Sequence, residues 1–217
     1  MSQNLDVQTQ DTKSEKEADA RLRIVRAATE MFFQYGIKSV SMDDVAHQLS
    51  MSKRTIYDIF SDKEDLVIAC LENSMQDLSE KEEYLRKGGA TVLQLALETY
   101  KVILNYRFSP KFLIDLQKYP RAIDMLERRR KEQLRQYMTF FRKGITEGVF
   151  RDDINYALIV QIMRRHMESL PPIDLVEKFS MREIHTTMFI VILRGMSTVK
   201  GNEIIDRYVT NGNFLIQ

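Results

Sequence analysis

The sequence predicts an all-α fold, on the strength of its composition, its hydrophobic periodicity and its helix-capping signals. Apolar residues recur at helical spacing after a polar N-terminal segment, and no segment shows the sustained period-two alternation of a half-buried strand. Glycine and proline number only 8 and 4 among 217 residues, and 44% of the residues are hydrophobic. This composition excludes a disordered or collagen-like chain and supplies a sizeable buried core.

Charge and cysteine content exclude several classes of protein. The net charge is +1, from 32 basic and 31 acidic residues, so any signal for nucleic-acid binding must be local. The single cysteine, Cys70, has no partner for an intramolecular disulfide, and no cysteine cluster is present to hold zinc. Apolar runs fall far short of the roughly 18 residues of a spanning helix, and the N-terminus lacks the apolar stretch of a signal peptide. We therefore expect a cytoplasmic protein without membrane segments, metal or cofactor.

Capping signals delimit the first helices. We expect a polar, disordered tail over residues 1–19 and a helix over about 20–35, which ends at Gly36. Ser41–Asp44 is a capping box that opens a short helix, and Ser61–Glu64 is a second capping box that opens a longer one. Beyond a break at residues 87–89, the periodicity and the prolines predict further helices at about 90–106, 109–117, 120–147, 154–169 and 180–199.

Residues 42–60 have the pattern of a helix-turn-helix, with two short helices joined by a three-residue turn. In the second helix Ile56 and Phe60 face inward, whereas Arg54 and Asp58 face outward. The flanking positions carry further polar side chains, namely Lys53, Thr55 and Tyr57. Such a face suits the major groove of DNA. The alternative is an ordinary solvated face on which Arg54 pairs with Asp58.

A wider string of residues strengthens the first reading. The helix ending at Gly36, the segment Ser41–Ala46 and the segment Met51–Leu66 together resemble the N-terminal domain of the TetR family of bacterial transcriptional regulators. The resemblance covers about residues 20–70; beyond it the chain resembles the family in architecture and in Gly148–Ile154, which is similar to the family's lead into its eighth helix. It implies a helix-turn-helix DNA-binding domain over residues 20–66 and a helical ligand-binding and dimerisation domain over residues 67–217.

The resemblance also implies roles for single residues. Lys53 and Thr55 are expected to face the groove, Tyr57 to touch the DNA backbone, and Lys63 to contact a phosphate. A cation in the first turn of a helix opposes the helix dipole, and such a local rule-break often marks function; the alternative is that the neighbouring acids merely offset it. Two departures from the family pattern are Arg54, where a small residue is common, and Ser50, where glycine is frequent. With the N-cap serines, the candidate DNA-binding residues are Ser41, Ser52, Lys53, Arg54, Thr55, Tyr57 and Lys63.

Two apolar stripes in the last two long helices predict a homodimer. One stripe consists of Val160, Met163, Met167 and Leu170, and the other of Ile184, Met188, Val191 and Ile192. In the family such helices pack against their copies in a four-helix interface. The alternative is that both stripes belong to the core of one chain.

The candidate ligand-binding residues are apolar or amphipathic side chains on the helices expected to surround a cavity. They are Tyr100, Phe108, Phe112, Phe140, Met163, His166 and Met167. A small hydrophobic or cationic ligand would suit them, although such residues are more often plain core. His166 is either a polar anchor or a satisfied core histidine, and a metal site of His166, Glu168 and His185 lacks any recognised spacing. Cys70 lies on an apolar face, where it is expected to be inert packing and not a redox sensor.

The function predicted from these observations is a ligand-responsive homodimeric repressor that binds a palindromic DNA operator. One alternative is a DNA-binding regulator without a small-molecule ligand, and another is a helical ligand carrier or enzyme. The sequence shows no nucleophile paired with a histidine and a carboxylate, and no glycine-rich phosphate loop. We therefore expect no catalytic activity.

Overall fold

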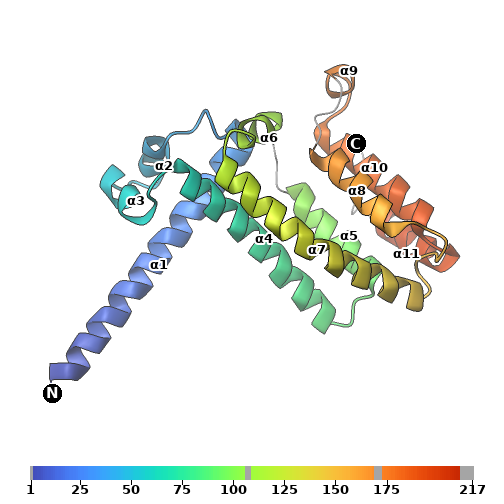
Figure 1. The fold of residues 1–217 in the computed structure, drawn as a ribbon, viewed down its shortest axis with the longest axis horizontal. Helices are drawn as coiled ribbons and strands as arrows, with labels where there is room; N and C mark the ends of the chain where they lie inside the picture. The colour runs from blue at the N-terminus through green and yellow to red at the C-terminus, as the bar shows by residue number, and fades with distance from the viewer. Residues whose placement is uncertain (1, 106–108, 169–172, 211–217) are drawn as a thin grey trace. The chain divides into compact units, whose positions relative to one another are not determined.

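The computed structural model describes residues 2–105, 109–168 and 173–210, and these residues form α-helices (Figure 1). An isolated antiparallel bridge joins Phe150 to Ser197, and the described residues contain no strand. The predicted all-α class is confirmed. None of the helices in the described part of the chain is long and apolar enough to cross a membrane. The helices are α1 (Ser2–Tyr35), α2 (Met42–Gln48), α3 (Lys53–Ile59), α4 (Lys63–Lys87), α5 (Val92–Asn105), α6 (Pro110–Leu116), α7 (Pro120–Thr146), α8 (Tyr156–Glu168), α9 (Ile173–Val176), α10 (Met181–Met196) and α11 (Val199–Tyr208).

The chain divides into two compact units. Residues 1–76 and 107–125 form the N-terminal unit, and residues 77–106 and 126–217 form the C-terminal unit. The segment with α6 and the start of α7 was assigned from the sequence to the larger domain, but it packs with the N-terminal helices. The N–H of Ser109 donates to the carbonyl of Phe33 at 2.7 Å, and the Phe33 ring meets Phe112 edge-on at 4.7 Å between centroids. These contacts join segments far apart in sequence, which local patterns do not reveal.

Helix α1 ends where the sequence predicts but begins earlier. Its first residue is Ser2, whereas the prediction placed a disordered tail over residues 1–19. That tail contains no glycine or proline, so nothing in it terminates a helix that continues from residue 20. At the other end Gly36 adopts a φ of +87°, and a Cβ there would lie 2.8 Å from the Cβ of Lys111 on α6. Glycine therefore provides both the helix end and the close approach of α6.

The core of the C-terminal unit is built by α5, α7, α8, α10 and α11. Its most buried members include Leu97, Phe150, Leu193 and Ile205. The helix predicted over 180–199 is α10, which ends at Met196, and Thr198 caps a separate helix, α11, by accepting the N–H of Gly201. Helices α9 and α11 were not predicted, although the Ser-Thr pair before α11 is a helix-start signal.

Candidate DNA-binding site

A capping box fixes the start of α2. The Ser41 hydroxyl accepts the N–H of Asp44 at 3.1 Å, and the Asp44 carboxylate accepts the N–H of Ser41 at 2.7 Å. The backbone N–H of Ser41 and then its hydroxyl hold the pKa of Asp44 below its usual value. The predicted capping box is confirmed, and it orients α2 for the turn that follows.

The turn between α2 and α3 depends on one left-handed residue. Ser50 has a φ of +54°, which L-residues other than glycine and asparagine adopt infrequently. The N–H of Met51 then donates to the carbonyl of Ala46 at 2.9 Å, and the N–H of Ser50 to that of His47 at 3.0 Å. The geometry that glycine commonly provides at this position is thus adopted by serine, and the helix-turn-helix shape is kept.

Helix α3 turns its apolar side chains inward and its charged ones outward, as its periodicity predicts. Ile56 and Phe60 are only 0% and 1% exposed, whereas the side chain of Arg54 is 90% exposed. Tyr57 is 45% exposed beside it. At the N-cap, Ser52 accepts the N–H of Thr55 at 3.1 Å, and the two hydroxyl oxygens lie 2.8 Å apart. The exposed face of α3 therefore presents a guanidinium, a phenol and a capped helix start.

The two cations of α3 are held differently. Lys53 Nζ lies 2.9 Å from the Asp43 carboxylate on α2 and 5.8 Å from the centre of the Tyr57 ring. The hydrogen bond that Lys53 donates to Asp43 raises the pKa of Lys53. Arg54 Nε is 3.9 Å from Asp58, which is too long for a hydrogen bond. Sequence reasoning missed Asp43, because its pairing with Lys53 depends on how α2 packs on α3 and not on any spacing within one helix.

Lys63 is the first residue of α4 and is held over an aromatic ring. It is half-buried, and its Nζ lies 5.9 Å from the centre of the Phe32 ring. Burial lowers the pKa of Lys63, and the charges of Asp115 and Asp44 oppose that shift. Its aliphatic stem is thus shielded while its ammonium stays close to the start of the helix.

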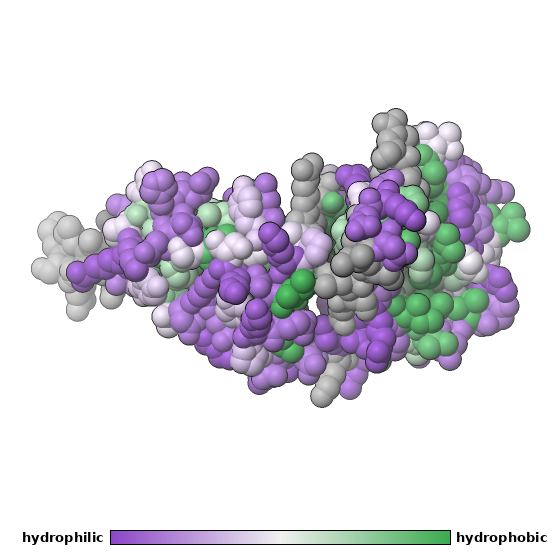
Figure 2. Space-filling model, turned by 90° about the horizontal axis from the view of Figure 1, so that it is seen from above, coloured by the Kyte–Doolittle hydropathy of each residue, from purple (hydrophilic) through white to green (hydrophobic). Residues whose placement is uncertain are grey.

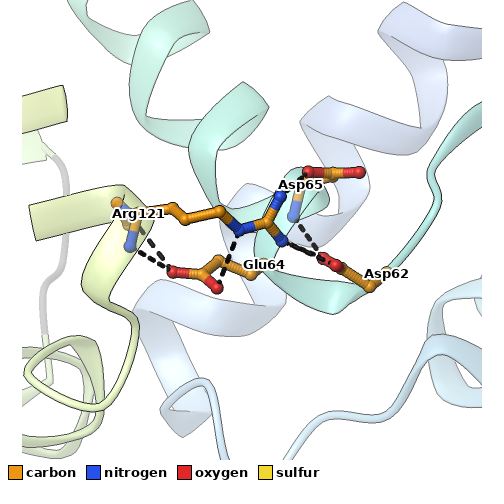
Figure 3. Close-up of polar contacts among 5 residues, drawn as sticks. Asp62, Glu64, Asp65 and Arg121 are labelled. Atoms are coloured by element: carbon orange, nitrogen blue, oxygen red, sulfur yellow. Dashed lines mark hydrogen bonds and ion pairs between the residues drawn. The ribbon is translucent and has the colours of Figure 1, made fainter. Parts of the chain in front are cut away.

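The acids around Lys63 have another partner, which sequence reasoning did not find. Asp62, Glu64 and Asp65 all engage the guanidinium of Arg121 on α7, within the same N-terminal unit (Figure 3). Arg121 stands more than fifty residues further along the chain, so no local pattern indicates the contact. The alternative was that these acids merely neutralise the charge of Lys63. That alternative is incomplete, because the acids also pair with Arg121.

The predicted ligand residues are divided between the two units. Tyr100, Phe140 and Met163 belong to the core of the C-terminal unit, where the Tyr100 ring stacks on Phe189 at 3.6 Å between centroids. Phe112 instead packs in the N-terminal unit and does not join them there. Phe108 and the side chain of Met167 lie outside the described residues. A surface hollow of about 440 Å³ in the C-terminal unit has a different lining, namely Ile145, Phe150, Arg151, Asp152, Asp153 and Thr198.

Two histidines meet in the C-terminal unit. The rings of His166 on α8 and His185 on α10 lie 5.0 Å apart, edge to face. Among the described residues, His166 Nε2 and His185 Nδ1 are buried without a hydrogen-bond partner. Burial lowers the pKa of both imidazoles. Among the described residues, the Nε2 atom of His166 thus lacks the partner expected of a satisfied core histidine.

Neither a metal site nor a reactive thiol follows from the described residues. They contain no group of three or more metal-ligating side chains, and the side chain of Glu168 lies outside them. Cys70 is buried, its thiol donates to the Val25 carbonyl at 3.5 Å, and burial raises its pKa to about 12. Such a thiol has little thiolate at neutral pH and acts as packing.

The fold and this exposed face define a helix-turn-helix DNA-binding regulator. The family model described as bacterial regulatory proteins, tetR family, matches residues 24–70. The transcriptional repressor KstR2 of Mycolicibacterium smegmatis is 24% identical over 165 residues, which cover 71% of this chain and 78% of that protein. These matches identify residues 24–70 as the DNA-binding domain of a TetR-family transcriptional regulator, a kind of protein that binds DNA and is not an enzyme.

Solved structures agree with the fold over most of the chain. A gamma-butyrolactone receptor matches with a TM-score of 0.59 and 17% identity, covering 90% of this chain and 95% of its own. A transcriptional regulator from Saccharomonospora viridis in complex with choline matches with a TM-score of 0.61 and 17% identity, covering 83% and 99%. At these identities the likeness establishes the fold alone.

Proposed function

We propose that this regulator is a ligand-responsive homodimeric repressor that binds a palindromic operator through α3 and the start of α4. The observation that carries the proposal is the exposed face of α3, where Arg54 is 90% exposed and only loosely paired. An extended guanidinium can bond the O6 and N7 atoms of guanine in the major groove. The protein would act in the cytoplasm, where bacterial operators lie.

The remaining DNA contacts are assigned by chemistry and position. Lys53 and Thr55 face the groove from the start of α3, and Tyr57 reaches the sugar-phosphate backbone. Lys63 binds a phosphate from the first turn of α4. The N-cap serines, Ser41 and Ser52, place free backbone N–H groups where phosphates can approach.

The dimer is proposed to form through α8 and α10. Both helices expose apolar side chains, with Leu158 and Ile162 on α8 at 54% and 43%, and Met188 and Val191 on α10 at 37% and 59%. Figure 2 shows apolar surface among polar surface on the C-terminal unit. Of the predicted stripes, Val160, Met163 and Ile192 pack against the core of their own unit, whereas Met188 and Val191 are exposed. The exposed side chains of α8, Leu158 and Ile162, were not part of the predicted stripe. Leu170 and the side chain of Met167 lie outside the described residues. A two-fold dimer would also present two copies of α3, one for each half-site of a palindromic operator.

The ligand is proposed to be a small hydrophobic or cationic molecule bound in the C-terminal unit. The aromatic core around Tyr100, Phe140 and Met163 offers an apolar environment, and the unpartnered Nε2 of His166 offers a polar anchor. One structural neighbour is a receptor for a gamma-butyrolactone, and another was solved with choline. A ligand that binds the folded state raises the melting temperature, and it releases DNA if it prefers the DNA-incompetent form by about 1–3 kcal/mol.

The test of the DNA-binding proposal compares two basic residues with different roles. Arg54→Ala should cost about 1–3 kcal/mol per half-site on the operator and relax base preference there. Lys63→Ala should weaken all sequences alike and lower the salt slope by about 0.9 per half-site. Binding of both variants is measured against DNA from upstream of the protein's own gene and against a scrambled duplex, across a salt series.

Two results would contradict this assignment. If Arg54→Ala weakened both duplexes equally and changed the salt slope, Arg54 would be a phosphate contact. If the wild-type protein bound both duplexes with equal affinity, operator recognition itself would fail.

A further inference from the structure

The first turn of α4 carries more negative than positive charge, at a place where a phosphate is proposed to bind. Asp62, Glu64 and Asp65 flank Lys63 in the sequence, so this segment carries three carboxylates and one ammonium, an excess of two negative charges. Carboxylates are favourable at a helix N-terminus, but they repel a DNA phosphate. A further cation is needed at this end of α4 if Lys63 is to contact DNA.

Arg121 supplies that cation with a geometry that uses every nitrogen of its side chain (Figure 3). Its Nη2 lies 2.6 and 2.7 Å from the two oxygens of Asp62, and its Nη1 lies 2.6 Å from Asp65. Its Nε donates to Glu64 at 3.1 Å. A planar guanidinium can bind all three carboxylates at once, whereas the single ammonium of a lysine cannot reach all three.

The contact is reciprocal, because Glu64 also caps α7. The other oxygen of Glu64 accepts the backbone N–H of Arg121 at 2.7 Å and that of Ala122 at 3.3 Å. These N–H groups lie in the first turn of α7, where they have no partner within the helix. Asp62 in turn accepts the N–H of Asp65 at 2.8 Å, which caps α4. The two helix starts therefore hold each other in one arrangement.

Lys63 lies at the same helix start but has other neighbours. Its ammonium lies over the Phe32 ring, and the charges of Asp44 and Asp115 raise its pKa against the effect of burial. The carboxylates of Asp62, Glu64 and Asp65 pair with Arg121 instead. Removing Arg121 would release three carboxylates beside Lys63, free to attract its ammonium or to face an incoming phosphate.

We propose that Arg121 is a positioning residue for DNA binding, which holds Asp62, Glu64 and Asp65 so that Lys63 is presented to a DNA phosphate. This role rests on the proposed phosphate contact of Lys63. Arg121 acts through Lys63 and makes no DNA contact of its own.

A double-mutant cycle tests the coupling of the two residues. At about 0.15 M salt a phosphate contact with a slope of 0.9 is worth about fivefold in affinity, so Lys63→Ala should weaken binding to a mixed-sequence duplex about fivefold per half-site. Arg121→Ala should cause a similar loss in the wild-type background and less than twofold in the Lys63→Ala background. Equal losses in both backgrounds, or no loss in either, would overturn the proposal. Circular dichroism and thermal melting establish that each variant is folded.

Two further variants separate geometry from charge. Asp65→Asn deletes a negative charge near DNA, which by simple electrostatics tightens binding; if Arg121 requires its carboxylate partners, binding weakens about twofold or more instead. Glu72→Gln removes the same charge two turns further along α4, from an exposed position, and is the matched control. Arg121→Lys should behave like Arg121→Ala. Wild-type affinity in Arg121→Lys, or tighter binding in Asp65→Asn, would overturn the positioning role.

The outcomes also distinguish this role from the proposed function. If the wild-type protein fails to bind DNA, the proposed function is wrong. If it binds but Lys63→Ala leaves affinity and salt slope unchanged, the phosphate contact is wrong, and the role of Arg121 is overturned with it.

Discussion

The two units of this protein expose different kinds of surface. In the N-terminal unit, short helices pack on a buried apolar core and are also fixed by caps and ion pairs, and the outward side chains of α3 are charged or polar. In the C-terminal unit, an aromatic and aliphatic core fixes the helices, and the outward face of α8 and α10 is apolar. The first kind of face matches a polyanion, and the second matches another apolar surface. The comparison teaches that the kind of surface each unit exposes indicates the kind of partner it fits.

The largest expected effect comes from placing a charge among the exposed apolar side chains of α8 and α10. Val191→Asp should destabilise the proposed dimer by several kcal/mol, a hundredfold or more in its dissociation constant, because each interface would bury two uncompensated carboxylates. Since Val191 is 59% exposed in the single chain, the variant should remain folded. Sedimentation should therefore show a folded monomer.

The control for this change is Ile114→Asp, at a residue that is 48% exposed in the N-terminal unit. It should leave the dimer intact. A wild-type protein that is monomeric at micromolar concentration would contradict the dimer, and an unfolded Val191→Asp variant would assign Val191 to the core.

The units also differ in how far the sequence predicts them. The start of α2 and the inward face of α3 follow from Ser41, Asp44 and Ile56, because these residues act on neighbours within four positions. The sequence does not predict that Lys53 pairs with Asp43, or that the acids of α4 pair with Arg121. These residues come together only when the helices pack. The apolar stripes of α8 and α10 were visible, but only packing decides which of their residues face the core.

The next effect concerns a polar atom that is buried without a partner among the described residues of the C-terminal unit. His166→Phe removes the unpartnered Nε2 and should stabilise the folded chain by about 1–2 kcal/mol, since such a group costs its full desolvation. Thermal unfolding measures the gain, and His47→Phe at an exposed histidine should give none. A loss of stability would mean that the ring is held by interactions that phenylalanine cannot replace.

The same variant has a defined pH dependence. Burial lowers the pKa of His166 in the folded state, so the unfolded chain takes up a proton more readily as the pH falls. The contribution of His166 to stability is therefore complete above its unfolded pKa of about 6.5 and is lost as the pH falls towards the folded pKa. The decline of stability with acid should be smaller in His166→Phe than in wild type, and an unchanged decline would contradict the assignment.

A smaller effect is expected from releasing Lys53, on the exposed face of α3, from its carboxylate partner Asp43. Asp43→Asn removes the carboxylate 2.9 Å from Lys53 Nζ and makes that ammonium available to DNA. Affinity for both operator and mixed-sequence duplexes should rise by up to about fivefold per half-site, with a steeper salt dependence. Asp58→Asn deletes the same charge beside Arg54, but the distance there is 3.9 Å, so its effect should be smaller. Equal effects of the two changes would show that net charge alone matters.

The smallest effect concerns the turn that sets α3 against α2. Ser50 has a φ of +54°, where a side chain costs about 1–2 kcal/mol and glycine costs nothing. Glycine loses more backbone entropy on folding, by about 0.5–1 kcal/mol, so Ser50→Gly should be stabilising by about 0.5–1 kcal/mol in net terms. Ser50→Ala is the matched control and should not be stabilising, because alanine keeps the Cβ. Chemical denaturation at constant m-value measures both, and operator affinity should not change, since the turn already has the geometry that glycine favours. A destabilised Ser50→Gly variant would mean that the hydroxyl contributes more to stability than the strain costs.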